Sequence, residues 1–193
     1  MNTFSIRESF GRGWSLFKTH KSLFVLAGLI SLILNGGQKG RGILGVLFFI
    51  VSLLAQVGLI KIFLKLLDGE EAKIGEVFNY GELFIRYLIV YVLFALGFIV
   101  GMVLLIVPGI WFALTYTFAP VLSIDKKLGF KEAFRESARL TKGHKGKIAL
   151  LILALIGANI IGALCLVVGL LVSVPVSSVA YLAVYRKLQG QAA

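Results

Sequence analysis

The sequence predicts an all-α fold: a polytopic membrane helix bundle with six spans, built as three helical hairpins that are each preceded by an interfacial amphipathic helix. The first observation is composition, because 59% of the 193 residues are hydrophobic and the mean hydropathy is +0.95. In ordinary soluble domains the hydrophobic fraction is only roughly 45 to 50% of the residues. The second is the length of the uncharged stretches 87–124 and 148–185, 38 residues each. As helices these would measure about 57 Å, nearly twice the thickness of a bilayer core.

Each long apolar stretch must therefore turn back on itself, and each has helix breakers near its middle. A third apolar stretch, 22–60, is interrupted only by Lys39 and Arg41 and has the breakers Gly36, Gly37 and Gly42. The breakers are Pro108 and Gly109 in 87–124, and Pro175 in 148–185. The predicted spans are 15–35, 43–65, 82–107, 108–124, 147–172 and 173–187. The first, fourth and sixth contain few strictly apolar residues, and re-entrant hairpins remain an alternative for the fourth and sixth.

The basic residues predict the orientation of the spans. Of the 20 Lys and Arg residues, 18 lie in the segments 1–21, 61–86, 125–147 and 186–193. By the positive-inside rule these segments and both termini are cytoplasmic, which predicts a multi-pass protein of the cytoplasmic membrane. A net charge of +11 also suits nucleic acid, but the apolar stretches favour a membrane, so no nucleic-acid partner is expected. Residues 1–21 do not resemble a cleavable signal, and the first span is expected to remain.

Three related segments precede the hairpins. A shift of 124 residues superposes Glu8, Phe10, Leu16, Lys18, His20 and Lys21 on Glu132, Phe134, Leu140, Lys142, His144 and Lys145. A shift of 68 residues brings Glu8 onto Glu76 and Phe10 onto Phe78. The pattern predicts three repeats, about 1–69, 70–129 and 130–190, within one transmembrane domain, 1–193. All three share one orientation, because each has an even number of crossings. Convergence of pre-membrane helices on Phe, Glu and Lys is the alternative.

The most charged of these segments, 130–141, has helical periodicity. One side of the predicted helix carries Phe130, Ala133, Phe134, Ser137 and Thr141, and another carries Lys131, Arg135 and Arg139. Such a helix can lie flat at the membrane boundary with its rings inserted. The rings can equally pack against the spans, and the two interpretations are compatible.

Basic residues beside the membrane are the candidate contacts for lipid headgroups. These candidates are Lys18, His20, Lys21, Lys142, His144 and Lys145. Membrane lipids, anionic ones among them, are therefore the expected partners, since each basic residue near an anionic surface contributes about 1 kcal/mol. Protein partners are not indicated. The same residues also serve as ordinary orientation anchors, which is the competing interpretation.

Catalytic machinery is not apparent in the sequence. His20 and His144 lack Cys, Asp or Glu partners at metal-ligand spacing, and Cys165 is the single cysteine. The central parts of the spans hold no ionisable residue, which argues against proton coupling and acid-base catalysis there. We therefore expect no enzyme, no metal and no cofactor, and predict a lipid-contacting scaffold or accessory subunit. A lipid-headgroup hydrolase would require the two histidines to meet acids around a metal.

A small permease or channel for a neutral or amphiphilic solute is the main alternative. Its candidate polar cavity is formed by Gln56, Tyr116 and Asn159. Pro120, inside the fourth predicted span, should kink that helix and free a carbonyl near Tyr116. Pro108 and Pro175 are instead expected in the first turns of the fourth and sixth spans, where a missing N–H costs little.

Two long motifs resemble a known family. VPGIWFALTYTFAPVLSID, residues 107–125, and EAFRESARLTKGHKGK, residues 132–147, are similar to a poorly characterised prokaryotic six-span family. That family includes the membrane domain attached to some glycerophosphodiester phosphodiesterases, together with stand-alone relatives. The opening SFGRGWSLFKTHK, residues 9–21, resembles the start of the same family. The resemblance implies fold and membrane placement, and it implies no enzymatic activity because the phosphodiesterase barrel has no counterpart in the chain.

Overall fold

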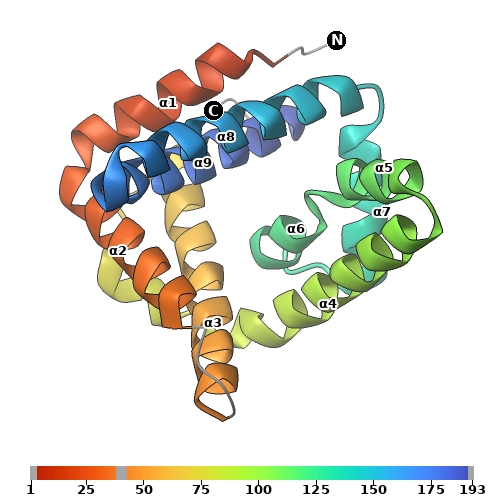
Figure 1. Ribbon diagram of the computed structural model, residues 1–193, viewed down its shortest axis with the longest axis horizontal. Helices are drawn as coiled ribbons and strands as arrows, with labels where there is room; N and C mark the ends of the chain where they lie inside the picture. The colour runs from red at the N-terminus through yellow and green to blue at the C-terminus, as the bar shows by residue number, and fades with distance from the viewer. Residues whose placement is uncertain (1–3, 38–42, 191–193) are drawn as a thin grey trace. The chain divides into compact units, whose positions relative to one another are not determined.

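Helices make up all the regular structure in the part of the chain that the computed structural model describes, residues 4–37 and 43–190 (Figure 1). The predicted all-α fold class is confirmed. In chain order the elements are α1 (Ile6–Thr19), α2 (Lys21–Gly37), α3 (Ile43–Leu67), the 3-10 helix η1 (Ile74–Phe78), α4 (Gly81–Leu104), α5 (Ile106–Tyr116), α6 (Ala119–Asp125), α7 (Phe130–Thr141), α8 (Lys145–Leu164) and α9 (Leu166–Leu188).

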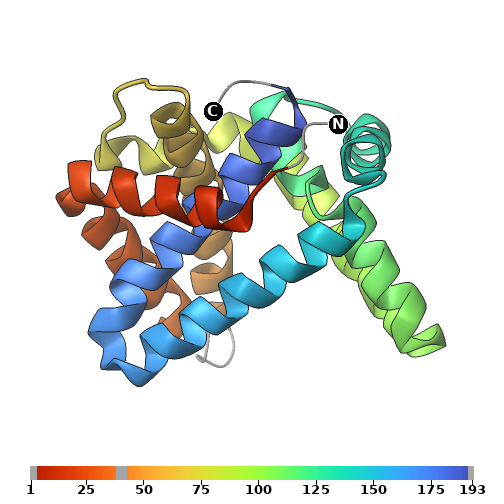
Figure 2. The same ribbon diagram turned by 90° about the horizontal axis from the view of Figure 1, so that it is seen from above.

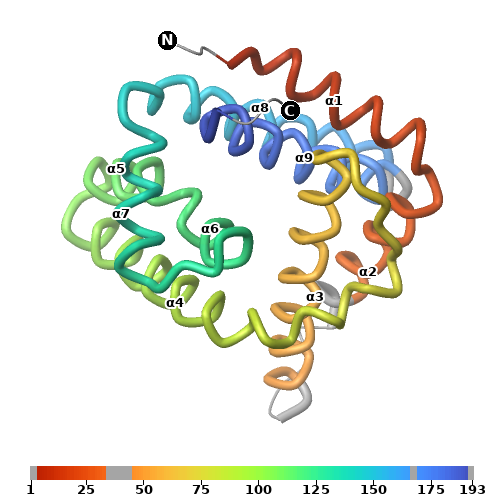
Figure 3. The backbone as a smooth tube through the Cα atoms, turned by 180° about the vertical axis from the view of Figure 1, so that it is seen from behind, coloured from red at the N-terminus to blue at the C-terminus, as the bar shows by residue number. Residues whose placement is uncertain are grey.

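The helices gather into two compact units. The first unit contains Met1–Gly81 and Leu153–Ala193, and the second contains Glu82–Ile152, so that α8 begins in the second unit and ends in the first. In the first unit, α2 packs against both α3 and α9 (Figure 3). In the second unit, α4 and α5 run alongside each other (Figure 2), with the backbones meeting at Gly101 and Gly109.

Among the described residues, five helices are long and apolar enough to cross a membrane. They are Gly45–Leu67, Gly81–Leu104, Ile106–Asp125, which combines α5 and α6, Lys145–Leu164 and Gly169–Leu188. A sixth crossing depends on α1 and α2, which are bent by 107° relative to each other. The predicted start of the first span at Ser15 is therefore wrong, because His20 leaves helical geometry and α2 starts at Lys21. The bend separates the polar end of α1 from the apolar helix that follows.

The connections within the hairpins differ from the predicted turns. The Gly-rich connection at 38–42 lies outside the described residues. In the second hairpin the chain breaks at the extended residue Leu105, and Pro108 lies in the first turn of α5, as predicted. In the third hairpin the break is at Cys165, so the predicted turn at Pro175 is wrong and this proline lies inside α9.

The packing of α2 on α9 gives a physical reason why Pro175 is tolerated inside a helix. Proline has no N–H to bond the carbonyl four residues earlier, here that of Leu171. The backbone of α2 lies directly against this carbonyl at Gly28, where a Cβ atom would come within 2.3 Å of the Leu171 oxygen. The break in the helical bonding thus lies under a closely packed neighbouring backbone, which shields it from the surroundings.

The three segments that precede the hairpins share one packing rule. In the second unit α7 packs on α5 and α6, and in the first unit η1 packs on α3 and α1 packs on α9. Each segment thus contacts the second span of the preceding hairpin, and α1, which has no hairpin before it, contacts the last one. The middle segment is only a five-residue 3-10 helix rather than the predicted amphipathic helix. The descent of these segments from one repeat stays a prediction.

Ion pairs reinforce two of these three contacts. Lys187 Nζ on α9 lies 2.7 Å from Glu8 Oε2 on α1, and Lys65 Nζ on α3 lies 2.8 Å from Glu76 Oε2 on η1. The hydrogen bond from Lys187 holds the pKa of Glu8 below its usual value. Glu8 and Glu76 are the glutamates that the sequence superposes on Glu132. A basic residue at the end of a span therefore pairs with the glutamate of the segment packed on it.

Candidate functional site

The candidate site is built on an interruption of the fourth predicted span. Helix α5 ends at Tyr116 and α6 begins at Ala119, with Pro120 in the first turn of α6. Proline is favourable in a first turn, because the backbone N–H it lacks would have no intrahelical acceptor there. The predicted irregularity near Tyr116 is confirmed. It leaves backbone groups on both sides of the break that need partners other than their own helix.

Side chains of α7 supply those partners. The Ser137 hydroxyl donates to the Thr115 carbonyl oxygen at 3.0 Å and accepts a hydrogen bond from the Phe118 N–H at 3.2 Å. Thr141 Oγ1 donates to the same Thr115 oxygen, also at 3.0 Å. The side chains of Ser137 and Thr141 are completely buried. One short polar contact therefore joins α7 to both halves of the interrupted span.

The apolar side of α7 matches the predicted one except at its first residue. Ala133 is fully buried beside Ser137, and the Phe134 ring packs 5.1 Å from the ring of Tyr116. Phe130 is 45% exposed and does not join this packing. In the described structure the predicted lipid-inserting side of the helix is thus largely used to pack against α5 and α6.

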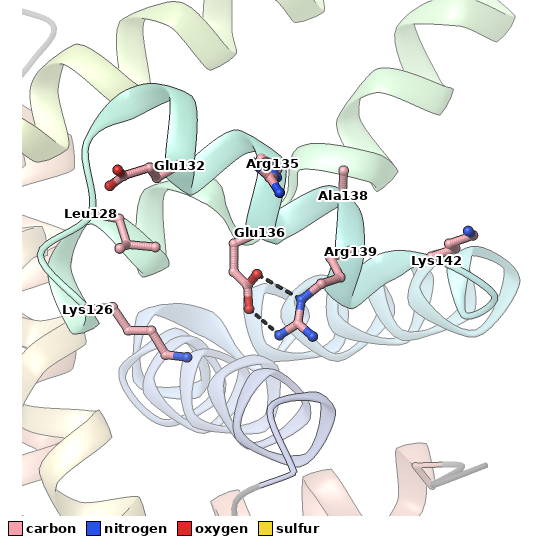
Figure 4. A pocket seen from close by; sticks show the side chains of 8 residues that line it. All are labelled: Lys126, Leu128, Glu132, Arg135, Glu136, Ala138, Arg139 and Lys142. Atoms are coloured by element: carbon pink, nitrogen blue, oxygen red, sulfur yellow. Dashed lines mark hydrogen bonds and ion pairs between the residues drawn. The ribbon is translucent and has the colours of Figure 1, made fainter.

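A pocket lies on another side of α7 (Figure 4). Its volume is about 720 Å³, and it is open to the surroundings. The lining residues are Lys126 and Leu128 from the connection before α7, Glu132, Arg135, Glu136, Ala138 and Arg139 from α7, and Lys142 just after it. On the helix these positions recur every three or four residues and so face one way. We call this the α7 pocket.

Basic side chains outnumber acidic ones in the α7 pocket. Arg139 forms two hydrogen bonds with Glu136, from Nε at 2.8 Å and from its terminal nitrogen at 2.5 Å. This bidentate contact lowers the pKa of Glu136, and the charges of Lys126 and Arg135 lower it further. The Glu132 carboxylate accepts a hydrogen bond from the Gly129 N–H, 3.4 Å away, at the start of the helix. One carboxylate is thus shared among several cations.

Among residues 4–37 and 43–190, Arg139 is the pocket cation that has a carboxylate at ion-pair distance. Lys126, Arg135 and Lys142 have none within that distance there, although the charges of Lys126 and Arg135 act on Glu136. The pre-hairpin segments α1 and η1 differ from α7 in the partner of their glutamate. Glu8 and Glu76 pair with lysines at the ends of the helices they pack on, whereas the superposed Glu132 leaves Lys126, just after α6, facing the pocket.

The predicted headgroup contacts fall into two groups. Lys18, His20 and Lys21 lie at the junction of α1 and α2 in the first unit, and Lys142, His144 and Lys145 lie at the junction of α7 and α8 in the second. Only Lys142 lines the α7 pocket. Lys145 instead places its ammonium group 2.9 Å from the centre of the Trp111 ring, and His144 Nδ1 lies 3.1 Å from the Lys142 carbonyl oxygen.

The residues predicted for a polar cavity do not line the α7 pocket. Gln56 is exposed on α3, and Tyr116 packs among the aromatic rings of the second unit. Asn159 is half-buried on α8 and donates from Nδ2 to the Leu155 carbonyl at 2.9 Å. Tyr116 belongs to the second unit and the other two residues to the first. A shared cavity of these three stays a prediction.

Sequence reasoning missed Lys126, Glu136 and the role of Arg135 and Arg139 as pocket residues. The available signal was the run of charges at 132, 135, 136, 139 and 142, which follows one helical face. What the sequence cannot show is that Ser137 and Thr141 fix the opposite side of α7 to a broken span. That contact determines which charges remain accessible.

The fold and the site define a class: a helical protein with several helices of membrane-spanning length and a basic pocket beside the ends of two of them. The chain belongs to the family described as "Protein of unknown function (DUF975)", whose model matches residues 95–192. This range includes the whole α7 pocket. The expectation of a poorly characterised family is confirmed. The matches show no link to the membrane domain of glycerophosphodiester phosphodiesterases.

Mycobacterial proteins are among the curated relatives. The chain is 28% identical over 142 residues to "Uncharacterized protein Mb2590" of Mycobacterium bovis and to "Uncharacterized protein MT2637" of Mycobacterium tuberculosis. It is 27% identical to "Uncharacterized protein Rv2560" of Mycobacterium tuberculosis. Each match covers 74% of this chain and 43% of the relative, so the chain spans less than half the length of these relatives. No solved structure matches the chain.

Proposed function

We propose that the chain is an integral protein of the cytoplasmic membrane, with both termini cytoplasmic, that contacts lipid and acts as a scaffold or accessory subunit without catalytic machinery. The single observation that carries this proposal is the exposure of α4. Only 11% of the most apolar part of this helix is buried. Val103 and Leu104 are 80% and 71% exposed. Water would disfavour an apolar surface of this extent, whereas lipid tails would cover it.

Membrane embedding is tested by extraction. Membranes from cells that produce the full chain are washed with high salt and then with alkaline carbonate, and the chain is located by immunoblotting. We expect it to stay in the membrane pellet after both washes and to be released by detergent. Release by carbonate alone would contradict an integral protein. The likeness to the phosphodiesterase membrane domain is part of the same proposal and carries no phosphodiesterase activity with it.

A permease for a neutral or amphiphilic solute is the second candidate. Its specific support is the Asn159 side-chain oxygen, which is buried on a candidate span and has no hydrogen-bond partner among the described residues. Purified chain in proteoliposomes is compared with empty liposomes for uptake of glycerol and urea. The scaffold proposal predicts equal rates. Saturable uptake that is lost in Asn159→Leu but kept in Asn79→Leu, outside the spans, would favour the permease.

A further inference from the structure

The α7 pocket lies between the ends of two candidate spans. One candidate span ends at Asp125 and the next begins at Lys145, so residues 126–144 connect them on one side of the proposed membrane. Lys126 and Lys142 are each within three residues of a span end. A pocket in such a connection lies at the level where apolar helices leave the hydrocarbon core. Phosphate groups are the abundant anions at that level.

The pocket's side chains suit a phosphate group. Guanidinium groups match phosphate oxygens geometrically and can bond them in a bidentate manner, and lysines add point charges. Arg135 and Arg139 are one helical turn apart on α7, and Lys126 extends toward the Glu136–Arg139 pair from the start of the helix (Figure 4). Lys142 lines the far end of the pocket, with its ammonium group turned outward. Four basic and two acidic residues leave the pocket with an excess of positive charge. Its volume, about 720 Å³, is within the range usual for small-ligand sites.

The arrangement is specific to the third pre-hairpin segment. In α1 the positions superposed on Arg135, Glu136 and Arg139 are Gly11, Arg12 and Ser15. A helix beside a membrane therefore does not need this cluster to pack or to orient the chain. Lys126 supports the same conclusion. The equivalent lysines in the other two contacts form ion pairs with Glu8 and Glu76, whereas no carboxylate in the described part of the chain lies at ion-pair distance from Lys126.

We propose that the α7 pocket is a binding site for a phosphate-bearing anion, held by Arg135, Arg139, Lys126 and Lys142. The shared chemistry is a phosphate ester, supplied either by the headgroup of an anionic phospholipid or by a soluble phosphate. The proposal deepens the proposed function and rests on it in one respect, since membrane embedding brings headgroup phosphates to the pocket. Glu136 orients the Arg139 guanidinium through its bidentate contact and limits the positive charge.

The test is lipid retention by the full chain purified in detergent, measured by native mass spectrometry. Dioleoyl phosphatidylglycerol and dioleoyl phosphatidylcholine are titrated separately onto the protein. We expect tighter binding of phosphatidylglycerol, and binding about 10- to 30-fold weaker in Arg135→Gln/Arg139→Gln. Arg7→Gln/Arg12→Gln removes two arginines from α1 and is the matched control, with affinity expected within about twofold of the wild type. Equal losses in the two double variants would overturn the proposal.

A variant that is expected to strengthen binding, rather than weaken it, separates a ligand-binding role from a structural one. Glu136→Gln removes a negative charge from the pocket and releases Arg139 from its carboxylate. Binding of phosphatidylglycerol should become several-fold tighter, and weaker binding would count against the proposal. Both substituted arginines are on the exposed side of α7, so all variants should keep the unfolding midpoint of the wild type.

A second arm distinguishes the two sources of phosphate. Glycerol 3-phosphate and inorganic phosphate are titrated by calorimetry onto the same detergent-solubilised protein. Binding of either that is lost in Arg135→Gln/Arg139→Gln supports the site with a soluble ligand, whereas binding of phosphatidylglycerol alone supports it with a lipid. If phosphatidylglycerol, glycerol 3-phosphate and inorganic phosphate all fail to bind, the proposed phosphate site is wrong. If the chain still resists carbonate extraction, the proposed membrane function stands without it.

Discussion

Ser137 on α7 donates its hydroxyl hydrogen to the carbonyl oxygen of Thr115 on α5, 22 residues earlier in the chain and 3.0 Å away. The bond exists because α5 and α6 do not form one continuous helix, which leaves this carbonyl without its usual intrahelical donor. Thr141 donates to the same oxygen. This contact fixes one side of α7 against α5, so the charged side of α7 that lines the pocket stays accessible.

Removing both donors should loosen α7 from the interrupted span. In Ser137→Ala/Thr141→Val the buried Thr115 oxygen loses two hydrogen bonds, and we expect a loss of about 1 to 3 kcal/mol in the free energy of unfolding. The measurement is unfolding of the detergent-solubilised chain followed by circular dichroism. Ser178→Ala is the control, because the Ser178 hydroxyl donates to the Val174 carbonyl of its own helix, at 3.0 Å, and to no other described residue. A double variant as stable as this control would refute the role of the contact.

The packing of η1 on α3 should depend on the absence of a side chain at Gly58. A Cβ atom there would lie 1.8 Å from the Val77 carbonyl oxygen, a backbone atom that cannot move aside alone. Gly58→Ala should therefore destabilise the chain by about 1 to 3 kcal/mol. Gly157→Ala on α8 is the matched variant, since a Cβ atom meets nothing within 4 Å there. It should be neutral or stabilising by up to about 1 kcal/mol. Identical midpoints for the two variants would contradict this account.

Glu76 should make the stability of the first unit depend on pH. Hydrogen bonds from Lys65 at 2.8 Å and then from Tyr80 at 3.1 Å hold the pKa of Glu76 below its ordinary value of 4.5. A carboxylate with a lowered pKa stabilises the fold above its ordinary pKa, and this contribution disappears as the pH falls through the lowered value. The wild type should therefore unfold at a higher temperature than Glu76→Gln at neutral pH, and the difference should vanish in acid.

A matched substitution in the same connection controls for the loss of a negative charge. Glu70 is exposed and forms no ion pair with any residue that the structure describes. Glu70→Gln should follow the wild type at every pH. A difference between the wild type and Glu76→Gln that is unchanged from neutral to acidic pH would show that the carboxylate charge is not responsible.

The orientation of the hairpins is testable with the native cysteine. Cys165 is exposed and forms the break between α8 and α9, after the last residue of α8, whereas the basic connection that contains α7 precedes the first residue of α8. An impermeant maleimide should label it in intact cells. On a Cys165→Ser background, Arg135→Cys should label only after permeabilisation. Ser137, although close by in sequence, is unsuitable because it is fully buried. Labelling in the reverse order would refute the cytoplasmic placement of the charged segments.

The helical class and most of the candidate spans could be predicted because they depend on long uncharged stretches, which any fold must shield from water. The breaks were less predictable. Pro108 and Pro120 lie in first turns, where proline fits a helix start. Pro175 has the same local preference yet lies inside α9, where the backbone of α2 packs at Gly28 against the Leu171 carbonyl that the proline leaves without a donor. This packing depends on a residue far away in the chain.

For the site, the sequence predicted basic residues at two helix junctions but not which of them share a pocket. Lys142 and Lys145 are three residues apart, and only the first faces the pocket, while the second lies over the Trp111 ring. The spacing of Arg135 and Arg139 predicted that they lie on one side of a helix, but it did not predict a pocket there. Their accessibility follows from the burial of Ser137 and Thr141 on the other side of α7.

By itself the sequence determined that the chain is helical, that its apolar segments must fold into hairpins, and that its charges gather in the connections. These properties follow from hydrophobicity and charge, which act locally and do not need a partner segment. Only the tertiary structure decided that α7 bonds to both sides of the break between α5 and α6. It also decided that Lys65 and Lys187 form ion pairs, whereas Lys126 has no carboxylate at that distance among residues 4–37 and 43–190. The reason is that hydrogen bonds and ion pairs between distant segments depend on distances of a few ångströms, which no spacing along one chain specifies.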